Sequence, residues 1–462
     1  MTLAHPASRP MPATSPATPG ATPPDPAARL VPLRGADHAA VLAEAVRVRA
    51  SGGIPVVGDE RWPAALMAAQ VEHAAATLRD LAVRDPRAAA EIAWAAFTSG
   101  STSRPRVVLR TEASWRAGHR VAADWLGLRP GEELLVAVHP VSSMAVHAAS
   151  LCGALGARLR VTARARLSAA DLAGPVVLDA TPSQLVDALD LLDDGAPSTL
   201  RVALIGGDRL PAGARDRAAA HGIRVAHFYG SAEASFVAVD LDGAGLRPLP
   251  DVRLRIADGA DDAGPAGPNT PDPNTPRART GLLELRSDQL AAPDDSRLSS
   301  GAPRWREDGW LTTGDRATWD PDAGVLEVHG RADDVILTAG ATVAAADVEA
   351  ELAAVRDGSG RPVASGVLVV GVPDRRLGER VCAVVEPARG QDPEAALQML
   401  KTAARAGLSP AARAGLSPAA RPRRWVLVDR LERTGSGKIR RVLPDAALPA
   451  ATRHAAGRQD HA

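Results

Sequence analysis

The strongest constraint on the fold is an alternation between residues 133 and 230, where short apolar runs alternate with helical segments. The runs suit strands and lie at 133–138, 176–179, 201–205 and 224–229, and a helix is expected at 183–192. Thr181-Pro182 fits the start of that helix, since proline is favoured at the first helical position. The alternation predicts an α/β fold with a mostly parallel, helix-covered sheet, and ligands of such sheets bind beyond the carboxyl ends of the strands.

The flanking regions predict two domains. Residues 32–95 have a mostly helical pattern, and the Pro- and Gly-rich stretches 258–280 and 291–306 are typical of surface insertions. A small α+β region follows, with helices expected at 345–355 and 393–406 and strands at 365–372, 380–386 and 424–429. We expect a disordered tail at 1–30, a large N-terminal domain at 31–330 with an abbreviated first part, a small mobile C-terminal domain at 331–445, and a second disordered tail at 446–462.

Composition excludes several classes of protein. The 54 basic side chains balance 54 acidic ones, which argues against a simple nucleic-acid binder. With only Cys152 and Cys382, the chain cannot build a disulfide framework or a cysteine-rich zinc site, so we expect a cytoplasmic protein. No stretch approaches the roughly 18 apolar residues that a transmembrane helix needs. Lys401 and Lys438 are the only lysines, and a lysine kept in such an arginine-rich chain can mark a place that needs a compact ammonium.

The most informative segment is FTSGSTSRPR at residues 97–106. Its hydroxyls, glycine and two cations follow an apolar run, so backbone N–H groups and side-chain donors can surround a polyphosphate. It is not a Walker loop, because the G-x-x-x-x-G-K-[ST] spacing is absent. By itself the segment is more typical of an ordinary Ser/Thr-rich turn, since such loops are common.

Four further segments favour a nucleotide site. HFYGSAE at 227–233 ends a predicted strand with a ring that can stack on a base and a carboxylate that can hold Mg²⁺. GWLTTGD at 309–315 places an acid after a glycine turn, where it can accept hydrogen bonds from ribose hydroxyls. GRADDVI at 330–336 and RTGSGKIR at 433–440 complete the set, and the latter carries Lys438 in a glycine-rich stretch.

Taken in order, the five segments resemble the ANL superfamily of AMP-forming adenylating enzymes, which includes acyl-CoA synthetases and compact members such as o-succinylbenzoate-CoA ligases. The resemblance covers residues 94 to 442. It implies the ANL fold, in which a large N-terminal domain and a small mobile C-terminal domain frame one ATP site. It also implies ATP, Mg²⁺ and coenzyme A as ligands, a small carboxylic acid as substrate, and no nucleic-acid partner; the oligomeric state stays open.

The resemblance also implies roles for individual residues. Catalysis is assigned to Lys438, Glu233 and Arg106, with Glu233 as the metal ligand. ATP or AMP would contact Thr98, Ser99, Gly100, Ser101, Thr102, Gly206, Gly207, Tyr229, Gly230, Ser231, Asp315 and Arg331. Asp333 would be the hinge, with Asp334 as the alternative, and Gly340 would lie beside the tunnel for the CoA arm.

The chain departs from the family pattern at several positions. Ser103 and Val107 replace glycines of the phosphate loop and Arg106 replaces a lysine, which restricts the backbone conformations open to the loop. Ala232 stands where threonine is usual, and Ser143 where a histidine of the acid pocket is frequent. His139 or His147 is a candidate substitute for that histidine, although a lone imidazole is more often structural.

The implied reaction joins a carboxylic acid to the α-phosphorus of ATP, releases pyrophosphate, and then transfers the acyl group to CoA. An aromatic content of 3% favours a fatty or other aliphatic acid. Three alternatives stay open: o-succinylbenzoate or another aromatic acid, a carrier-protein thiol as acceptor, and a catalytically impaired paralogue that only binds nucleotide or acyl ligands.

Overall fold

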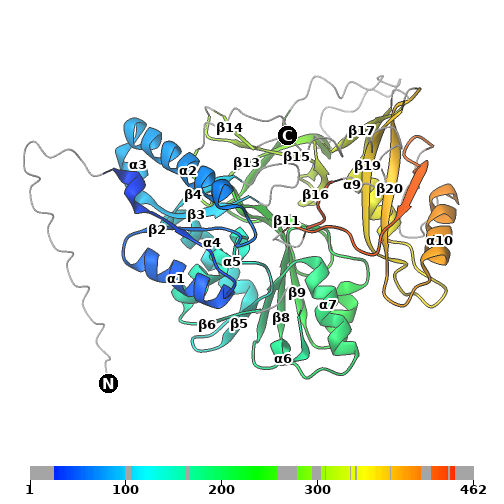
Figure 1. Cartoon of the computed structure of the whole chain (residues 1–462), viewed down its shortest axis with the longest axis horizontal. Helices are drawn as coiled ribbons and strands as arrows, with labels where there is room; N and C mark the ends of the chain where they lie inside the picture. Colours follow the sequence, from blue (N-terminus) through cyan, green and yellow to red (C-terminus); the bar gives the residue numbers. More distant parts are fainter. Residues whose placement is uncertain are drawn as a thin grey trace, which may run out of the picture.

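The computed structural model describes residues 25–98, 106–162, 167–257, 278–293, 303–306, 308–332, 334–338, 341–374, 376–406, 418–434 and 438–442. These residues form four sheets (Figure 1). Two of the sheets contain parallel strands covered by helices, a third is antiparallel, and the fourth lies in the C-terminal part of the chain. The mixed α/β architecture predicted from the strand-helix alternation is confirmed.

The central sheet has seven strands in the order β11-β10-β9-β8-β7-β5-β6 and runs parallel from β6 to β9. The four strands expected in the 133–230 region, β5 (Glu133–Val136), β7 (Val177–Ala180), β8 (Val202–Gly206) and β9 (Arg224–Ser231), are present within two residues of their predicted bounds. The sheet also contains β6 (Arg158–Val161), β10 (Ser235–Asp240) and β11 (Arg247–Pro248), which were not predicted. The two antiparallel strands β10 and β11 extend the sheet at one edge.

Helices cover both faces of the central sheet because successive residues of its buried strands alternate between two apolar cores. Leu134 and Leu204 pack toward α4 (Glu112–Leu126) and α5 (Ser143–Leu155). Leu135 and Ile205 face the opposite core, with α6 (Ala169–Leu172), α7 (Pro182–Asp193) and α8 (Ala214–Ala220). A capping box from Thr181 and Gln184 starts α7 with Pro182 in its first turn, as the sequence predicted.

The N-terminal region contains a sheet that its helical pattern did not predict. Strands β1 (Leu30–Leu33), β2 (Ile54–Val57), β3 (Ile92–Phe97) and β4 (Val107–Thr111) form a sheet flanked by η1 (Pro26–Arg29), α1 (His38–Ala50), α2 (Ala64–Arg84) and α3 (Pro86–Glu91). Strands β2 and β3 are almost entirely buried, so they lack the polar-apolar alternation that distinguishes a strand from a helix segment.

The remaining two sheets follow in chain order. The antiparallel sheet contains β12 (Arg253–Ala257), β13 (Arg279–Arg286), β14 (Arg304–Trp305), β15 (Leu311–Asp320) and β16 (Val325–Arg331). The C-terminal sheet contains β17 (Val335–Thr338), β18 (Ala341–Ala344), β19 (Ala364–Asp374), β20 (Gly378–Pro387) and β21 (Arg424–Leu427), with α9 (Ala345–Ala353) and α10 (Pro393–Ala406). We propose two domains with bounds near the expected 31–330 and 331–445. The expected tail was too long, because residues 25–30 contain η1 and the first residue of β1, and Arg331 still belongs to β16.

Candidate functional site

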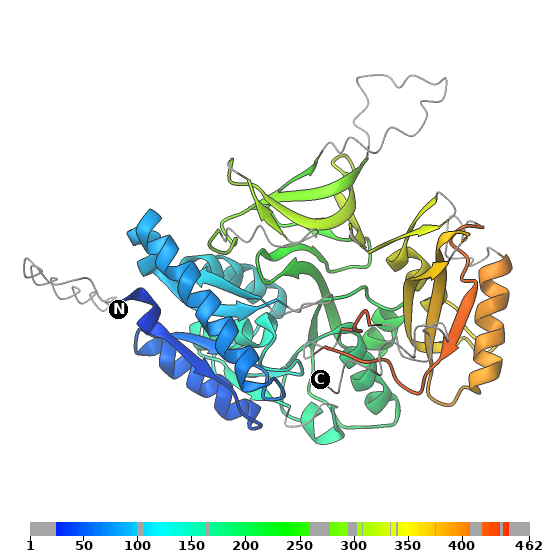
Figure 2. The same ribbon diagram turned by 45° about the horizontal axis from the view of Figure 1, so that its top comes forward.

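One large cleft is lined by residues of the central, antiparallel and C-terminal sheets. The chain after β21 runs from the C-terminal sheet toward the central sheet (Figure 2). Most of the site residues inferred from the sequence line this cleft, namely Thr98, Arg106, Gly207, Tyr229, Gly230, Ser231, Glu233, Asp315, Arg331 and Lys438. Gly206 ends strand β8, directly before Gly207. The chain therefore brings together side chains that are up to 340 residues apart in sequence.

Six of the inferred residues lie outside the described part of the chain. These are four of the phosphate loop, the expected hinge residue and the residue assigned to the CoA tunnel: Ser99, Gly100, Ser101, Thr102, Asp333 and Gly340. Thr98 and Arg106, at the two ends of the loop, are joined by a hydrogen bond from the Thr98 N–H to the Arg106 carbonyl, at 2.9 Å. The two ends of the phosphate loop are thus held side by side at the cleft.

Glu233 lies in the tight turn between β9 and β10. Ser235, the first residue of β10 after this turn, has a φ of 55°, a left-handed conformation that is uncommon for a residue other than glycine. Arg110 of β4, which is fully buried, holds the turn by donating from Nη1 to the Ala232 carbonyl at 2.6 Å and from Nη2 to the Gln289 carbonyl. Burial lowers the pKa of Arg110 to about 9, and the nearby Glu233 carboxylate opposes that shift.

The carboxylate of Glu233 is paired with Arg106, at 3.1 Å between Oε1 and Nη2. Both side chains are largely shielded, with exposed fractions of 10% for Glu233 and 28% for Arg106. The carboxylate can bind a divalent cation and the guanidinium can bind a phosphate oxygen, so the two ligands would lie next to each other in the cleft.

A second charged group joins the central and antiparallel sheets. The Tyr229 hydroxyl donates to Asp315 Oδ2 at 2.5 Å, and Arg331 Nη1 lies 3.5 Å from Asp315 Oδ1. Burial raises the pKa of the Asp315 carboxyl, whereas the charge of Arg331 opposes the rise. Because Tyr229 and Asp315 come from different sheets, their bond fixes an aromatic ring beside a carboxylate at the cleft.

Lys438 enters the cleft from the C-terminal segment. Its Cε would lie 3.3 Å from a Cβ placed on Gly207, a residue with a φ of 96°. The Lys438 charge lowers the pKa of Asp315, against the larger effect of burial, so the ammonium and that carboxylate interact within the cleft. A side chain at position 207 would be strained in this backbone conformation and crowd the lysine.

Arg441, three residues after Lys438, ties this segment to the C-terminal sheet. Its Nε lies 2.8 Å from Asp334 Oδ2, and its Nη2 lies 2.9 Å from Glu349 Oε2 on α9. The same guanidinium donates to the Val369 carbonyl at 3.1 Å. Asp334, the alternative hinge residue in the sequence, is therefore bonded to the segment that carries Lys438.

Two glycines at the site are required by close packing. A Cβ on Gly206 would lie 2.2 Å from the Phe228 ring, and one on Gly230 would lie 1.9 Å from the Ser235 carbonyl oxygen. The β9–β10 turn and the ring of Phe228 can take these positions only because both residues lack side chains.

Part of the lining of the cleft faces the apolar core that α4 and α5 share with the central sheet, and we call this part of the lining the buried arm. The sequence did not predict it. It comprises Trp115, Met144, His147, Asp179, Leu204, Phe228 and Phe236. Two of these side chains carry buried polar atoms, Asp179 Oδ1 and His147 Nε2, for which the described residues provide no hydrogen-bond partner. In the sequence, Asp179 is an acidic residue that follows a short apolar run. That pattern is equally expected where a strand simply ends, so by itself it does not predict a binding site.

Burial raises the pKa of Asp179 from its ordinary 3.8 to about 8. Between about pH 4 and pH 8 the folded protein therefore holds a proton that the unfolded chain releases, so this carboxyl makes stability fall as the pH rises. We expect Asp179→Asn to flatten that fall by up to about 1.4 kcal/mol per pH unit. Urea unfolding at pH 5, 6.5 and 8 measures the effect; parallel profiles for the variant and the parent would contradict it.

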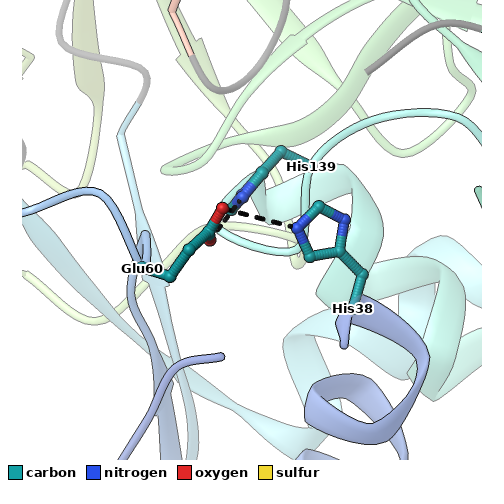
Figure 3. Close-up of side chains that lie close together, drawn as sticks. All are labelled: His38, Glu60 and His139. Atoms are coloured by element: carbon teal, nitrogen blue, oxygen red, sulfur yellow. Dashed lines mark hydrogen bonds and ion pairs between the residues drawn. The ribbon is translucent and has the colours of Figure 1, made fainter. Parts of the chain in front are cut away.

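His139, one of the two candidate histidines for the acid pocket, is held in a cluster with Glu60 and His38 (Figure 3). The Val141 N–H donates to its Nδ1 at 3.1 Å, so the ring proton lies on Nε2 and points at Glu60 Oε2, 2.9 Å away. A metal on Nε2 would need the proton on Nδ1, which already accepts that N–H. The contacts thus favour a structural hydrogen-bond network, as the sequence suggested for a lone histidine.

Comparisons with known proteins identify the family of the chain as one that binds AMP. A family model described as AMP-binding enzyme matches residues 27–271, and one described as AMP-binding enzyme C-terminal domain matches 361–438. A probable 2-succinylbenzoate–CoA ligase of Mycobacterium tuberculosis is 30% identical over 365 residues, or 76% of this chain and 83% of that protein. A 3-hydroxybenzoate–CoA ligase of Aromatoleum is 27% identical over 78% of this chain and 67% of its own length.

Solved structures show the same fold. The o-succinylbenzoate CoA synthetase of Bacillus subtilis, in complex with its acyl-adenylate intermediate, superimposes with a TM-score of 0.66 at 18% identity and covers 89% of this chain and 87% of that one. An anthranilate CoA ligase with bound anthranoyl-AMP gives a TM-score of 0.62 at 21% identity, over 78% of this chain and 68% of that one. Among the helices of the described residues, none combines the length and apolar character needed to cross a bilayer.

Proposed function

This chain belongs to the AMP-binding enzymes of the ANL superfamily, and from that membership and its cleft we propose that it is an ATP-dependent acid–thiol ligase for an aromatic carboxylic acid. The observation that carries the proposal is the aromatic lining of the buried arm, Trp115, Phe228 and Phe236. These rings line the same cleft as Glu233, Asp315 and Lys438. Flat aromatic walls suit a ring better than a flexible chain.

In the first half-reaction the acid's carboxylate oxygen forms a bond to the α-phosphorus of ATP, and pyrophosphate leaves with the electron pair of the broken P–O bond. Two anions have to approach each other, so the task of the protein is positioning and charge neutralisation. We assign Lys438 to the developing negative charge at the reacting phosphate and Arg106 to the phosphates that depart. Both cations line the cleft.

The nucleotide would be oriented by the group that joins the central and antiparallel sheets. Tyr229 offers a ring face for the adenine, and Asp315 with Arg331 offers acceptors and donors for the ribose hydroxyls. Gly206 and Gly207 would let the adenine approach the backbone at the end of β8. Gly230 and Ser231 line the same cleft and would contact the nucleotide next to Tyr229. Thr98 together with residues 99–102 would donate to the phosphates.

A magnesium ion fits the Glu233 position, because a shielded carboxylate beside phosphate oxygens is a ligand set that Mg²⁺ accepts. When bound, Mg²⁺ would neutralise charge on the phosphates. The protein's own contribution is to hold the Glu233 carboxylate in place through the turn that Arg110 anchors.

In the second half-reaction the thiolate of CoA would attack the carbonyl carbon of the acyl-adenylate and AMP would leave. Lys438 is not needed for this step, so we propose that the C-terminal domain moves about Asp333 or Asp334 to let the thiol enter near Gly340. A carrier-protein thiol is the alternative acceptor.

The function is tested by ATP–pyrophosphate exchange and CoA-dependent AMP release over a panel of benzoate derivatives, o-succinylbenzoate and fatty acids from acetate to palmitate. We expect at least one aromatic acid to support both reactions at ten times or more the kcat/KM of any aliphatic acid. Activity confined to aliphatic acids would favour the second candidate, which the 3% aromatic composition supports. ATP binding without exchange for any acid would instead indicate a binding protein.

A further inference from the structure

Asp179 is a buried carboxyl in a strand whose neighbours are apolar. It lies on β7 between Val136 of β5 and Leu204 of β8, its register partners, and 3% of its surface is exposed. Because strand residues alternate, its side chain points to the same side as Val177, toward the core that contains α4 and α5. In the part of the chain that is described, Oδ1 has no hydrogen-bond partner.

An unpartnered carboxyl at this depth is costly, since a buried polar group without a hydrogen bond loses its bonds to water and gains none in return. The apolar residues at the two flanking register positions show that the sheet itself has no need of a carboxyl here. Asp179 lines the cleft, so its missing partner can come from a bound molecule.

The surroundings of Asp179 limit what that molecule is. Rings of Trp115, Phe228 and Phe236 line the cleft and belong to the same apolar core as the two register partners of Asp179. The His147 ring lies 5.2 Å from the Phe236 ring and 5.6 Å from the Trp115 ring. His147 Nε2 is a second buried atom without a partner among the described residues. The arm therefore offers aromatic walls and two unmatched polar atoms, a combination that suits a ring with a polar substituent.

We propose that Asp179 determines specificity for an aromatic acid whose ring carries a hydroxyl or amino group, by hydrogen bonding to that group. The inference rests on the proposed function, because it places the ring in the arm while the acid's carboxylate faces Lys438. It narrows the substrate from aromatic acids in general to hydroxy- and amino-substituted ones.

The charge state of Asp179 distinguishes between polar substituents. With a pKa of about 8 the carboxyl holds its proton at neutral pH, so it can both donate and accept a hydrogen bond. A phenolic hydroxyl or an aryl amine is neutral at that pH and matches it. A site built to bond such a group rejects the analogue that lacks it, because the site's polar atom then stays unpaired.

The test compares benzoate with 3- and 4-hydroxybenzoate and 3- and 4-aminobenzoate in ATP–pyrophosphate exchange. For the parent protein we expect kcat/KM to favour at least one substituted acid over benzoate by about 100-fold or more. Asp179→Leu, which replaces the carboxyl with an apolar side chain, should bring that ratio to about one or below. The exposed Asp124→Asn on α4 is the matched control and should keep the parent ratio.

A change in this ratio separates specificity from a merely structural effect, which would lower the activity on all five acids alike. Circular dichroism checks folding, and Asp179→Val, with a β-branched residue suited to a strand, carries the same test if the leucine variant does not fold. Exchange with these acids at a ratio that Asp179→Leu or Asp179→Val leaves unchanged would overturn this inference alone. Absence of exchange with every acid of both panels would overturn the proposed function, and this inference with it.

Discussion

Lys438→Ala is expected to abolish acyl-adenylate formation, with a loss of at least 100-fold in ATP–pyrophosphate exchange, while the Kd for ATP changes by no more than a few-fold. The ammonium enters the cleft beside Gly207 and acts on Asp315, but Tyr229, Asp315 and Arg331 hold one another without it. Loss of a group aimed at charge that develops in the transition state lowers the rate more than it weakens binding.

The chain provides a matched control for this experiment, because Lys401 on α10 is its only other lysine. Lys401→Ala should leave exchange unchanged. Lys438→Arg adds a second comparison: a planar guanidinium is bulkier than an ammonium, so we expect it to recover less than a tenth of the activity. Exchange at the parent rate in Lys438→Ala would show that this cation has no part in adenylation.

Glu233→Gln is expected to lower exchange by 100-fold or more and to raise the Mg²⁺ concentration needed for half-maximal rate. The substitution keeps the shape of the side chain but removes the charge that pairs with Arg106 at 3.1 Å and that we assign to the metal. Exchange rates over 0.1–20 mM Mg²⁺ measure both effects.

Two results would contradict this assignment. One is an unchanged Mg²⁺ requirement in Glu233→Gln, and the other is an equal loss in Glu394→Gln, the control at the first turn of α10. Because Glu233 also interacts with buried Arg110, thermal melts of both variants show whether the turn between β9 and β10 is still formed.

Local patterns in the sequence predicted much of the fold. Strands β5, β7, β8 and β9 of the central sheet and the helices α7, α9 and α10 were expected within a few residues of their observed bounds, since each depends on periodicity and caps within a short window. Strands β6, β10 and β11 were not predicted. The N-terminal sheet was missed because β2 and β3 are buried on both faces and offer no alternation to detect.

The residues of the candidate site also fall into those that a local sequence pattern predicts and those that it does not. Residues within recognisable segments, such as Glu233 and Asp315, could be predicted as site residues because each segment has its own order of residue types, and both line the cleft. Arg110 and Asp179 were not, because their importance depends on what the fold brings to them. Arg110 bonds to carbonyls 122 and 179 residues away, and Asp179 is distinguished only by lacking a partner in a buried arm. Neither relation leaves a local pattern.

The double ion pair of Arg441 has a mechanical consequence. Because this guanidinium grips Asp334 at one end of the C-terminal sheet and Glu349 on α9, the lysine three residues earlier has little freedom to retreat by itself. Withdrawing Lys438 would instead require α9, the C-terminal sheet and the segment that carries Lys438 to move together as one rigid unit. One movement of this unit would then both remove Lys438 from the acyl-adenylate and open the path by which the thiol enters.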